Sequence, residues 1–330
     1  MMRFIVILLF IALFTDEAVA QDVQFSQPYN TPLFLNPAFA GHTGGNRIST
    51  VYRNQWPGIE HNYQAMGAGA DFHLGGVNGG LGITFVRDVA GTHRLSNTLA
   101  AFQYSQHIKL SKKSHLAVGV QAGYGQRSFD DSNLFFSDQV INQTSTSYEV
   151  QNLFPVTHFG DVSAGVLYYR GDSWLGVSLH HINQPNQSLL GAEDRLPAKF
   201  SVHGGWVLPF HQLYARPGNR MVRFLFNYKS QGNWDQLDLG GMYTIWGINL
   251  GVWYRGIPLK PYQPGYQNNE SIVMLFGYEL PQGLGFAYSY DLTISRLAGH
   301  SGGAHEISAY YEFNQRPKRP RKRIVPCAKF

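Results

Sequence analysis

The stretch Ser114–Gly125, SHLAVGVQAGYG, alternates between two kinds of side chain. Even-numbered positions from 116 to 124 hold Leu, Val, Val, Ala and Tyr, and odd-numbered positions from 117 to 125 hold Ala, Gly, Gln, Gly and Gly. This period of two over about ten residues indicates a β-strand with one apolar face and one small or polar face. The same alternation runs through Asn62–Leu74, Gly283–Asp291 and Ala304–Phe313. Such strands are typical of a membrane barrel with lipid outside and a lumen inside.

Marking every such segment predicts fourteen strands, an even number, as bacterial single-chain barrels require. Their approximate ranges are 46–54, 62–74, 79–88, 94–108, 114–129, 159–170, 173–182, 198–208, 220–230, 234–245, 247–256, 270–279, 283–292 and 303–313. With a periplasmic N-terminus, the connections after odd-numbered strands should be long and those after even-numbered strands short. Most obey this rule; 209–219 and 231–233 break it. A secreted β-sandwich would not sort its connections by parity, so the pattern favours an all-β, antiparallel outer-membrane barrel.

The composition and the first twenty residues agree with export to a membrane. Charged residues make up 14% of the chain, against about a quarter in soluble domains, and there are 36 glycines. Residues 1–20 resemble a signal peptide, with Arg3, the apolar run Phe4–Phe14 and Ala18-Val19-Ala20 before a cut near Gln21. That run is too short to span a bilayer, and no other run is suitable. A chain without membrane helices can span lipid only as a closed barrel, so we expect localisation to the bacterial outer membrane.

The basic character of the chain is concentrated at its end. The formal net charge is +5, but residues 314–330 carry seven Lys and Arg and no acid. Such a run is a solvated tail, or it binds an acidic partner or an anionic lipid surface. The partner-binding candidates here are Arg316, Lys318, Arg319, Arg321, Lys322 and Arg323. The lone Cys327 excludes an intramolecular disulfide.

The segment 21–45, before the first predicted strand, does not alternate. Its prolines, together with Asn36 and Gly41, predict irregular structure. Its apolar side chains nevertheless need burial, and the barrel lumen or its periplasmic mouth can provide it. The expected organisation is therefore a signal peptide at 1–20, a plug or gate at 21–45, a barrel at 46–313 and a basic periplasmic tail at 314–330. The candidate plug and partner-binding residues are Gln24, Phe25, Leu35, Asn36, Pro37, Ala38 and Gly41.

These segments also carry a resemblance to a known family. QDVQFSQ at 21–27 and LNPAFAG at 35–41 resemble the opening of mature PorP/SprF proteins. YRNQW at 52–56 and GGLG at 79–82, followed by Asp88, are similar to the next family motifs. YSYD at 288–291 and GGAHEIS at 302–308 resemble the closing hairpin. The resemblance covers the whole mature chain, and Asn36-Pro37-Ala38 is also similar to the plug region of FadL-like fourteen-stranded transporters.

The resemblance implies a component of the type IX secretion system, associated with surface adhesins in gliding bacteria. The implied partners are outer-membrane lipid, an adhesin-type cargo, and periplasmic secretion-system or peptidoglycan-associated proteins. No nucleic-acid partner is expected. The alternative is a FadL-like or porin-like channel for small solutes.

Enzymatic motifs are weak by comparison. GHSGG at 299–303 fits the G-x-S-x-G pattern around Ser301, but it lies between two predicted strands and not at a strand-to-helix elbow. His305 and Glu306 are adjacent on a strand and point to opposite faces. The histidines, including His180-His181, show no zinc spacing. We therefore expect no catalytic residue, no metal and no cofactor, and a hydrolase using Ser301 is the third hypothesis.

A few polar or aromatic residues stand out within the predicted barrel. Charged side chains in a lumen often pair across the barrel and maintain its shape. They can also hold the 21–45 segment in place, and the sequence does not separate these two roles. The candidates are Arg53, Trp56, Asp88, Asp291 and Glu306.

Overall fold

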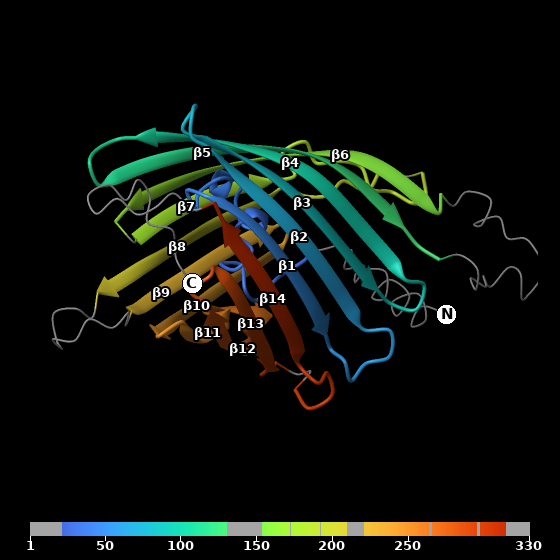
Figure 1. Ribbon diagram of the computed structural model, residues 1–330. Helices are drawn as coiled ribbons and strands as arrows, with labels where there is room; N and C mark the ends of the chain where they lie inside the picture. Colours follow the sequence, from blue (N-terminus) through green and yellow to red (C-terminus); the bar gives the residue numbers. More distant parts are fainter. Residues whose placement is uncertain are drawn as a thin grey trace, which may run out of the picture.

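The computed structural model describes residues 22–130, 154–171, 173–191, 193–209, 221–263, 266–295 and 298–314. Fourteen strands form one closed barrel in which each strand pairs with its neighbours in sequence and β1 pairs with β14 (Figure 1). All pairings are antiparallel. The predicted barrel is therefore confirmed, and a β-sandwich is excluded.

The strand bounds follow the alternating segments closely. They are β1 Asn46–Gln55, β2 Tyr63–Leu74, β3 Gly79–Ala90, β4 Leu95–Lys109, β5 Ser114–Ser128, β6 Val156–Arg170, β7 Ser173–His180, β8 Lys199–Pro209, β9 Met221–Gln231, β10 Trp234–Ile245, β11 Ile248–Gln263, β12 Tyr266–Glu279, β13 Leu284–Thr293 and β14 Ala304–Phe313. Two short 3₁₀ helices precede them, η1 Pro32–Phe34 and η2 Pro37–Phe39. No helix among the described residues is long and apolar enough to cross a membrane.

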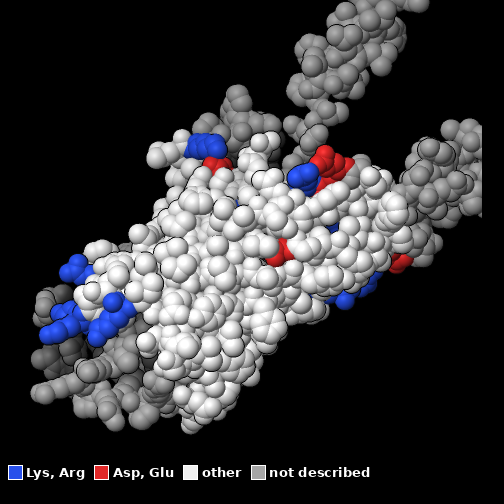
Figure 2. All heavy atoms as spheres, turned by 90° about the horizontal axis from the view of Figure 1, so that it is seen from above, with Lys and Arg blue, Asp and Glu red and all other residues white. Residues whose placement is uncertain are grey.

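The two faces of the wall differ as the alternation predicts. On β4, Phe102 is 62% exposed on the outside, whereas Gln103 and Ser105 are buried in the interior. Such residues form a continuous apolar outer surface around the barrel. This surface would be unfavourable in water and is stable in contact with lipid. Figure 2 shows a long flank with almost no charged side chains.

One predicted loop is wrong. The alternating segments 247–256 and 270–279 leave 257–269 as a long predicted outer connection. Instead β11 continues to Gln263 and β12 begins at Tyr266. The register shifts between Arg255 and Gly256, whose φ is +144°. A β-bulge thus absorbs the glycine without ending the strand.

The remaining connections give the barrel two distinct ends. We call the end that carries the start of β1 and the end of β14 the periplasmic end, because short turns face the periplasm in outer-membrane barrels. Its connections are 75–78, 110–113, 171–172, 210–220, 246–247 and 280–283. The opposite, outer end carries 56–62, 91–94, 129–155, 181–198, 232–233, 264–265 and 294–303. Within these connections, residues 131–153, 172, 192, 210–220, 264–265 and 296–297 lie outside the described residues.

Residues 22–45, called the luminal segment below, lie inside the barrel (Figure 1). The η1 helix contacts β3, and η2 contacts β4, β5 and β6. Asp22 is hydrogen-bonded to Lys199 near the outer end, and the segment leads to β1 at the periplasmic end. It therefore runs along the lumen from the outer end to the periplasmic end.

Candidate functional site

The local shape of the luminal segment follows from its prolines and Asn36. Pro32 and Pro37 occupy the first positions of the two 3₁₀ helices, where the fixed proline φ fits and no N–H is needed. Asn36 is the N-cap of η2, and its Oδ1 accepts a hydrogen bond from the Ala38 N–H at 2.8 Å. Gly41 ends the irregular part at a φ of +67°, and its N–H donates to Asp71. Its own prolines and Asn36 thus shape the two short helices, and Asp71 of β2 holds the turn at Gly41.

A buried ion-pair cluster fixes the segment near the outer end. The backbone N–H groups of Ser26 and Gln27 donate to the two carboxylate oxygens of Glu306 at 2.7 and 2.8 Å. The Ser26 hydroxyl donates to Asp291 at 2.6 Å. Arg53 bridges both carboxylates, at 2.8 Å from Asp291 and 3.2 Å from Glu306. Two wall carboxylates and one guanidinium therefore hold two consecutive residues of the segment.

A second guanidinium completes this cluster. Arg255 of β11 lies 2.9 Å from both Asp291 and Asp238, and it donates to the Ser26 hydroxyl at 3.0 Å. We call Ser26, Gln27, Arg53, Asp238, Arg255, Asp291 and Glu306 the ion-pair anchor. Because Arg53, Arg255 and Glu306 are at most 2% exposed, each charge depends on the others for compensation. The wall residues of the anchor come from five strands, β1, β10, β11, β13 and β14.

Asp22 forms a second anchor at the outer end. Its carboxylate lies 2.7 Å from His181 Nε2 and 2.5 Å from the Lys199 ammonium. The other ring nitrogen of His181 lies 2.6 Å from Asp161. Burial alone would lower the pKa of His181, but the carboxylates on both sides outweigh it and raise that pKa to about 9. The imidazolium and the ammonium in turn hold the pKa of Asp22 well below its usual value despite burial.

The Asp22 anchor should weaken at alkaline pH. The pKa of His181 is about 9 in the folded protein against an ordinary 6.5, so its stabilisation is complete below about 6.5 and is lost as the pH rises through 9. We expect the free energy of unfolding to fall by up to roughly 3 kcal/mol over this range. Urea unfolding in detergent at several pH values measures it, and His181→Gln should flatten the profile. An identical profile in that variant would contradict the assignment.

The middle of the luminal segment, Asn36–Ala38, packs directly against the backbone of the barrel wall. Asn36 Nδ2 donates to the carbonyl oxygens of Val166 and Val177 at 3.2 and 3.1 Å. A Cβ added at Gly165 would lie 2.0 Å from Asn36 Oδ1, and one at Gly119 would lie 2.3 Å from the Ala38 nitrogen. These two glycines are paired across β5 and β6. They form a flat area, called the glycine floor, on which Asn36–Ala38 fits only because side chains are absent.

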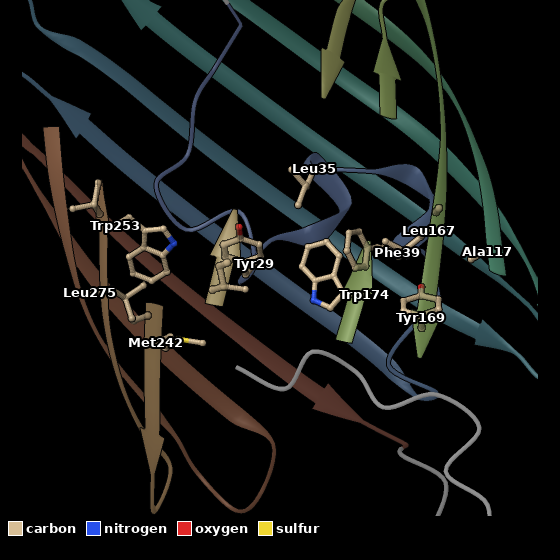
Figure 3. Packing of buried hydrophobic residues seen from close by; sticks show 14 residues of the cluster. Tyr29, Leu35, Phe39, Ala117, Leu167, Tyr169, Trp174, Met242, Trp253 and Leu275 are labelled. Atoms are coloured by element: carbon tan, nitrogen blue, oxygen red, sulfur yellow. The ribbon is translucent and has the colours of Figure 1, made fainter. Parts of the chain in front are cut away.

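Aromatic packing fills the space around the segment. Figure 3 shows Tyr29 between a group containing Trp253 and Leu275 and a group containing Trp174 and Phe39. The ring centroids of Trp174 lie 5.8 Å from Tyr29 and 5.4 Å from Phe39. Such contacts add apolar burial to the polar anchors.

A cavity of about 110 Å³ remains between the segment and the wall. Phe25, Phe34 and Leu99 give it apolar surface, and Lys199 and Lys229 give it charge. Gln24 also lines it. The luminal segment and the wall therefore enclose at least one cavity among the described residues.

The structure brings most of the candidate residues from the sequence to one region. Phe25 packs on Phe34 with 5.5 Å between ring centroids, and the carbonyl oxygen of Leu35 accepts from Ser178 at 2.8 Å. Gln24, Phe25, Leu35, Asn36, Pro37, Ala38 and Gly41 all belong to the luminal segment, and Arg53, Asp291 and Glu306 form its anchor.

Two candidates lie apart from the ion-pair anchor. The Trp56 N–H donates to the Gly303 carbonyl at 2.7 Å, which ties the β1–β2 connection to the β13–β14 connection. Asp88 lies on β3 opposite Ala65, and the structure does not bring it to Ser26 or Gln27. The basic tail candidates of 314–330 fall on or beyond residue 315, outside the described residues.

The residues considered for catalysis have structural contacts. The Ser301 hydroxyl donates to Thr293 at 3.2 Å and accepts from the Gly303 N–H at 3.3 Å, within the β13–β14 connection. His305 contacts Tyr288 on the outer face, opposite to Glu306, as the strand geometry predicts. Within the described ranges no group of three or more His, Cys, Asp or Glu could hold a metal ion.

Sequence analysis did not select Asp22, Asp161, His181, Lys199, Asp238 or Arg255. The alternation of the strands could have indicated some of them, because a charged residue between apolar neighbours on a barrel strand faces the lumen. Arg255 lies in such a position in β11, after Trp253 and Tyr254. Parity does not show which charges meet across the barrel.

The fold and the luminal segment define the class of protein, an outer-membrane β-barrel with its N-terminal segment bound in the lumen. A family model described as "Type IX secretion system membrane protein PorP/SprF" matches residues 18–311. The chain therefore belongs to the PorP/SprF family. No curated protein matches it.

Solved outer-membrane proteins are similar at low identity. Omp33 of Acinetobacter baumannii is 6% identical, with 82% of this chain and 98% of that chain covered and a TM-score of 0.46. The P. putida toluene transporter TodX is 12% identical, with 86% and 94% covered and a TM-score of 0.45. The CymD monoaromatic hydrocarbon channel is 12% identical, with 88% and 93% covered and a TM-score of 0.46. Identities this low carry no information about ligand or function.

Proposed function

We propose that this protein is a non-enzymatic component of a type IX secretion system that binds one secreted surface protein of the adhesin class. In this proposal the outer end receives the cargo, and the periplasmic end, with the basic tail 314–330, docks envelope partners. Family membership supports the secretion role. The charge of the tail, seven basic residues and no acid, supports docking to an acidic surface.

The ion-pair anchor is the observation that carries this proposal. A channel for solutes needs a continuous aqueous path, whereas the luminal segment is bonded to the wall by buried charges and packed by aromatic rings. We infer that residues 21–45 act as a plug, and that the barrel works as a binding platform. The 110 Å³ cavity is the observation that favours a small-solute channel as the second candidate.

Affinity purification of the tagged protein from outer membranes distinguishes the two candidates. The secretion role predicts recovery of a large surface protein or of periplasmic secretion components. A solitary barrel that conducts ions in lipid bilayers would contradict it and support the channel.

The tail requires its own test. Changing the six basic residues Arg316, Lys318, Arg319, Arg321, Lys322 and Arg323 to Gln keeps the length and removes the charge. We expect partner recovery and cargo export to fall about tenfold or more, with the barrel intact on heat-modifiability gels. A matched control replaces the same six residues by the other basic type and should retain function. Unchanged export after neutralisation would refute docking by the tail.

A further inference from the structure

Exposed basic side chains gather at the periplasmic end of β4, β5 and β6. They are Lys109, Lys112, Lys113 and Arg170, called the basic patch below. Figure 2 shows Lys and Arg side chains grouped at one end of the barrel and almost absent from the adjoining flank. The described residues of the two turns, 110–113 and 171, contain no acid, while Asp172 lies outside the described residues.

The patch is built from two turns that are tied together. The Gly171 N–H donates to the Lys113 carbonyl oxygen at 3.3 Å. Ser114 and Arg170 are direct partners in the β5–β6 ladder. Consequently the lysines of one turn and the arginine of the other are held on neighbouring strands, and their spacing is set by backbone hydrogen bonds.

Arg170 points away from the lumen. On β6, Leu167 and Tyr169 are buried inside, so the alternation of the strand places Tyr168 and Arg170 on the outer surface. The Tyr168 hydroxyl donates to the Ser114 hydroxyl at 3.3 Å, which leaves the Ser114 proton able to donate outward. A guanidinium and a hydroxyl donor therefore lie side by side on the membrane-facing surface.

Apolar side chains fix the depth of this group relative to lipid. Ile108 is 44% exposed and Leu110 is 56% exposed, on the strand end and turn that carry the lysines. Tyr168 is 37% exposed next to Arg170. Donors that border an apolar outer surface lie where the hydrocarbon gives way to headgroups, and a headgroup phosphate is the anion found at that depth.

We propose that Lys112, Lys113, Ser114 and Arg170 form a binding site for the phosphate group of a phospholipid in the periplasmic leaflet. The fork of Arg170 and the Ser114 hydroxyl contact the phosphate oxygens, and the two lysines neutralise its charge. An acidic protein would need donors turned to the periplasm, whereas Arg170 and Ser114 face outward from the barrel wall. The site is independent of cargo binding.

The test is native mass spectrometry of the full-length protein in detergent with short-chain phosphatidylglycerol. We expect Lys112→Gln/Lys113→Gln/Arg170→Gln to weaken lipid binding by about tenfold or more. The reason is that each basic residue near an anionic lipid surface adds to the affinity for the lipid. The matched control, Arg94→Gln/Arg195→Gln/Lys260→Gln, removes three exposed charges at the outer end. It should bind like the unmodified protein. Equal binding by both triple variants would overturn the proposal.

Two further arms separate a built site from general attraction. Ser114→Ala/Tyr168→Phe keeps every charge and should weaken binding severalfold, because it removes the hydroxyl pair; unchanged binding would overturn the assigned geometry. Inorganic phosphate should not displace the lipid at equal concentration, because it lacks acyl chains for Ile108 and Leu110. Displacement at equal concentration would overturn the lipid as ligand in favour of soluble phosphate, and capture of an acidic periplasmic protein by the same side chains would also overturn it.

Discussion

Replacing Arg53 by Gln should lower the free energy of unfolding by about 3–5 kcal/mol and release the outer part of the luminal segment. Arg53 compensates Asp291 and Glu306, and both carboxylates are buried. Without it, Arg255 still pairs with Asp291 and Asp238, whereas Glu306 loses its guanidinium partner. A buried carboxylate without its partner carries a large desolvation cost. Urea unfolding in detergent measures the free energy, and hydrogen exchange of residues 22–30 measures the release.

A charge-matched variant tests whether the effect is electrostatic. Arg53→Gln/Glu306→Gln removes one charge of each sign, and the amide oxygen at position 306 can still accept from the Ser26 N–H. We expect this double variant to recover much of the stability that Arg53→Gln loses. The exposed Arg87 on β3 serves as a surface control, and Arg87→Gln should change stability by less than about 0.5 kcal/mol. If Arg53→Gln unfolds like Arg87→Gln, the anchor does not hold the segment.

The barrel was predictable from sequence because its signal is local. A strand that separates lipid from a lumen must alternate at every residue, as 114–125 does. Each strand can therefore be recognised from its own sequence, without knowing which strand it pairs with. The prediction at 257–269 was wrong because it also rested on local sequence alone. The alternating segment was marked only as far as residue 256, and only the pairing with β12 shows that Gly256 is a bulge within a longer strand.

The candidate site was predictable only in part because its contacts are not local. Arg53 and Glu306 are 253 positions apart in sequence and meet because β1 and β14 close the barrel. Sequence analysis selected these residues and Asp291 as polar positions within the predicted barrel, and the alternation of β11 would place Arg255 in the lumen. Neither signal could reveal that Arg255 meets Ser26, or that Asp88 lies apart from it, because ring closure and strand register decide which inward charges come together.

The glycines illustrate the same limit. Gly119 and Gly165 read in sequence as small residues on an inward face, the usual composition of a lumen. The structure gives them a specific reason, since Asn36 and Ala38 occupy the space that their side chains would fill. The absence of side chains at these two glycines therefore lets the luminal segment lie directly against the backbone of the wall.

The glycine floor leads to the second large effect, displacement of the segment by single methyl groups. In Gly119→Ala/Gly165→Ala, the added Cβ atoms would lie 2.3 Å from a backbone nitrogen and 2.0 Å from Asn36 Oδ1. At Gly119 the contact is with backbone, so rotating a side chain cannot relieve it. At Gly165 it is with the Asn36 side chain, which hydrogen bonds to Val166 and Val177 hold in place. Overpacking costs about 1–3 kcal/mol at each site. We expect Asn36–Ala38 to leave the wall while the strands stay paired. Hydrogen exchange of residues 33–40 should rise by at least about tenfold, and bilayer conductance should appear or increase.

Gly160→Ala is the matched control, because Gly160 lies on the same strand as Gly165, is exposed, and has nothing within 4 Å of an added Cβ. Alanine in place of glycine within a strand otherwise stabilises by about 0.5–1 kcal/mol. The control should therefore keep or gain stability, and a loss in the double variant cannot come from the substitution type. Faster exchange without conductance would mean that the segment moves but does not close the lumen, which would contradict the plug. Conductance with cargo recovery unchanged would separate the plug from partner binding and assign the latter to the ends of the barrel.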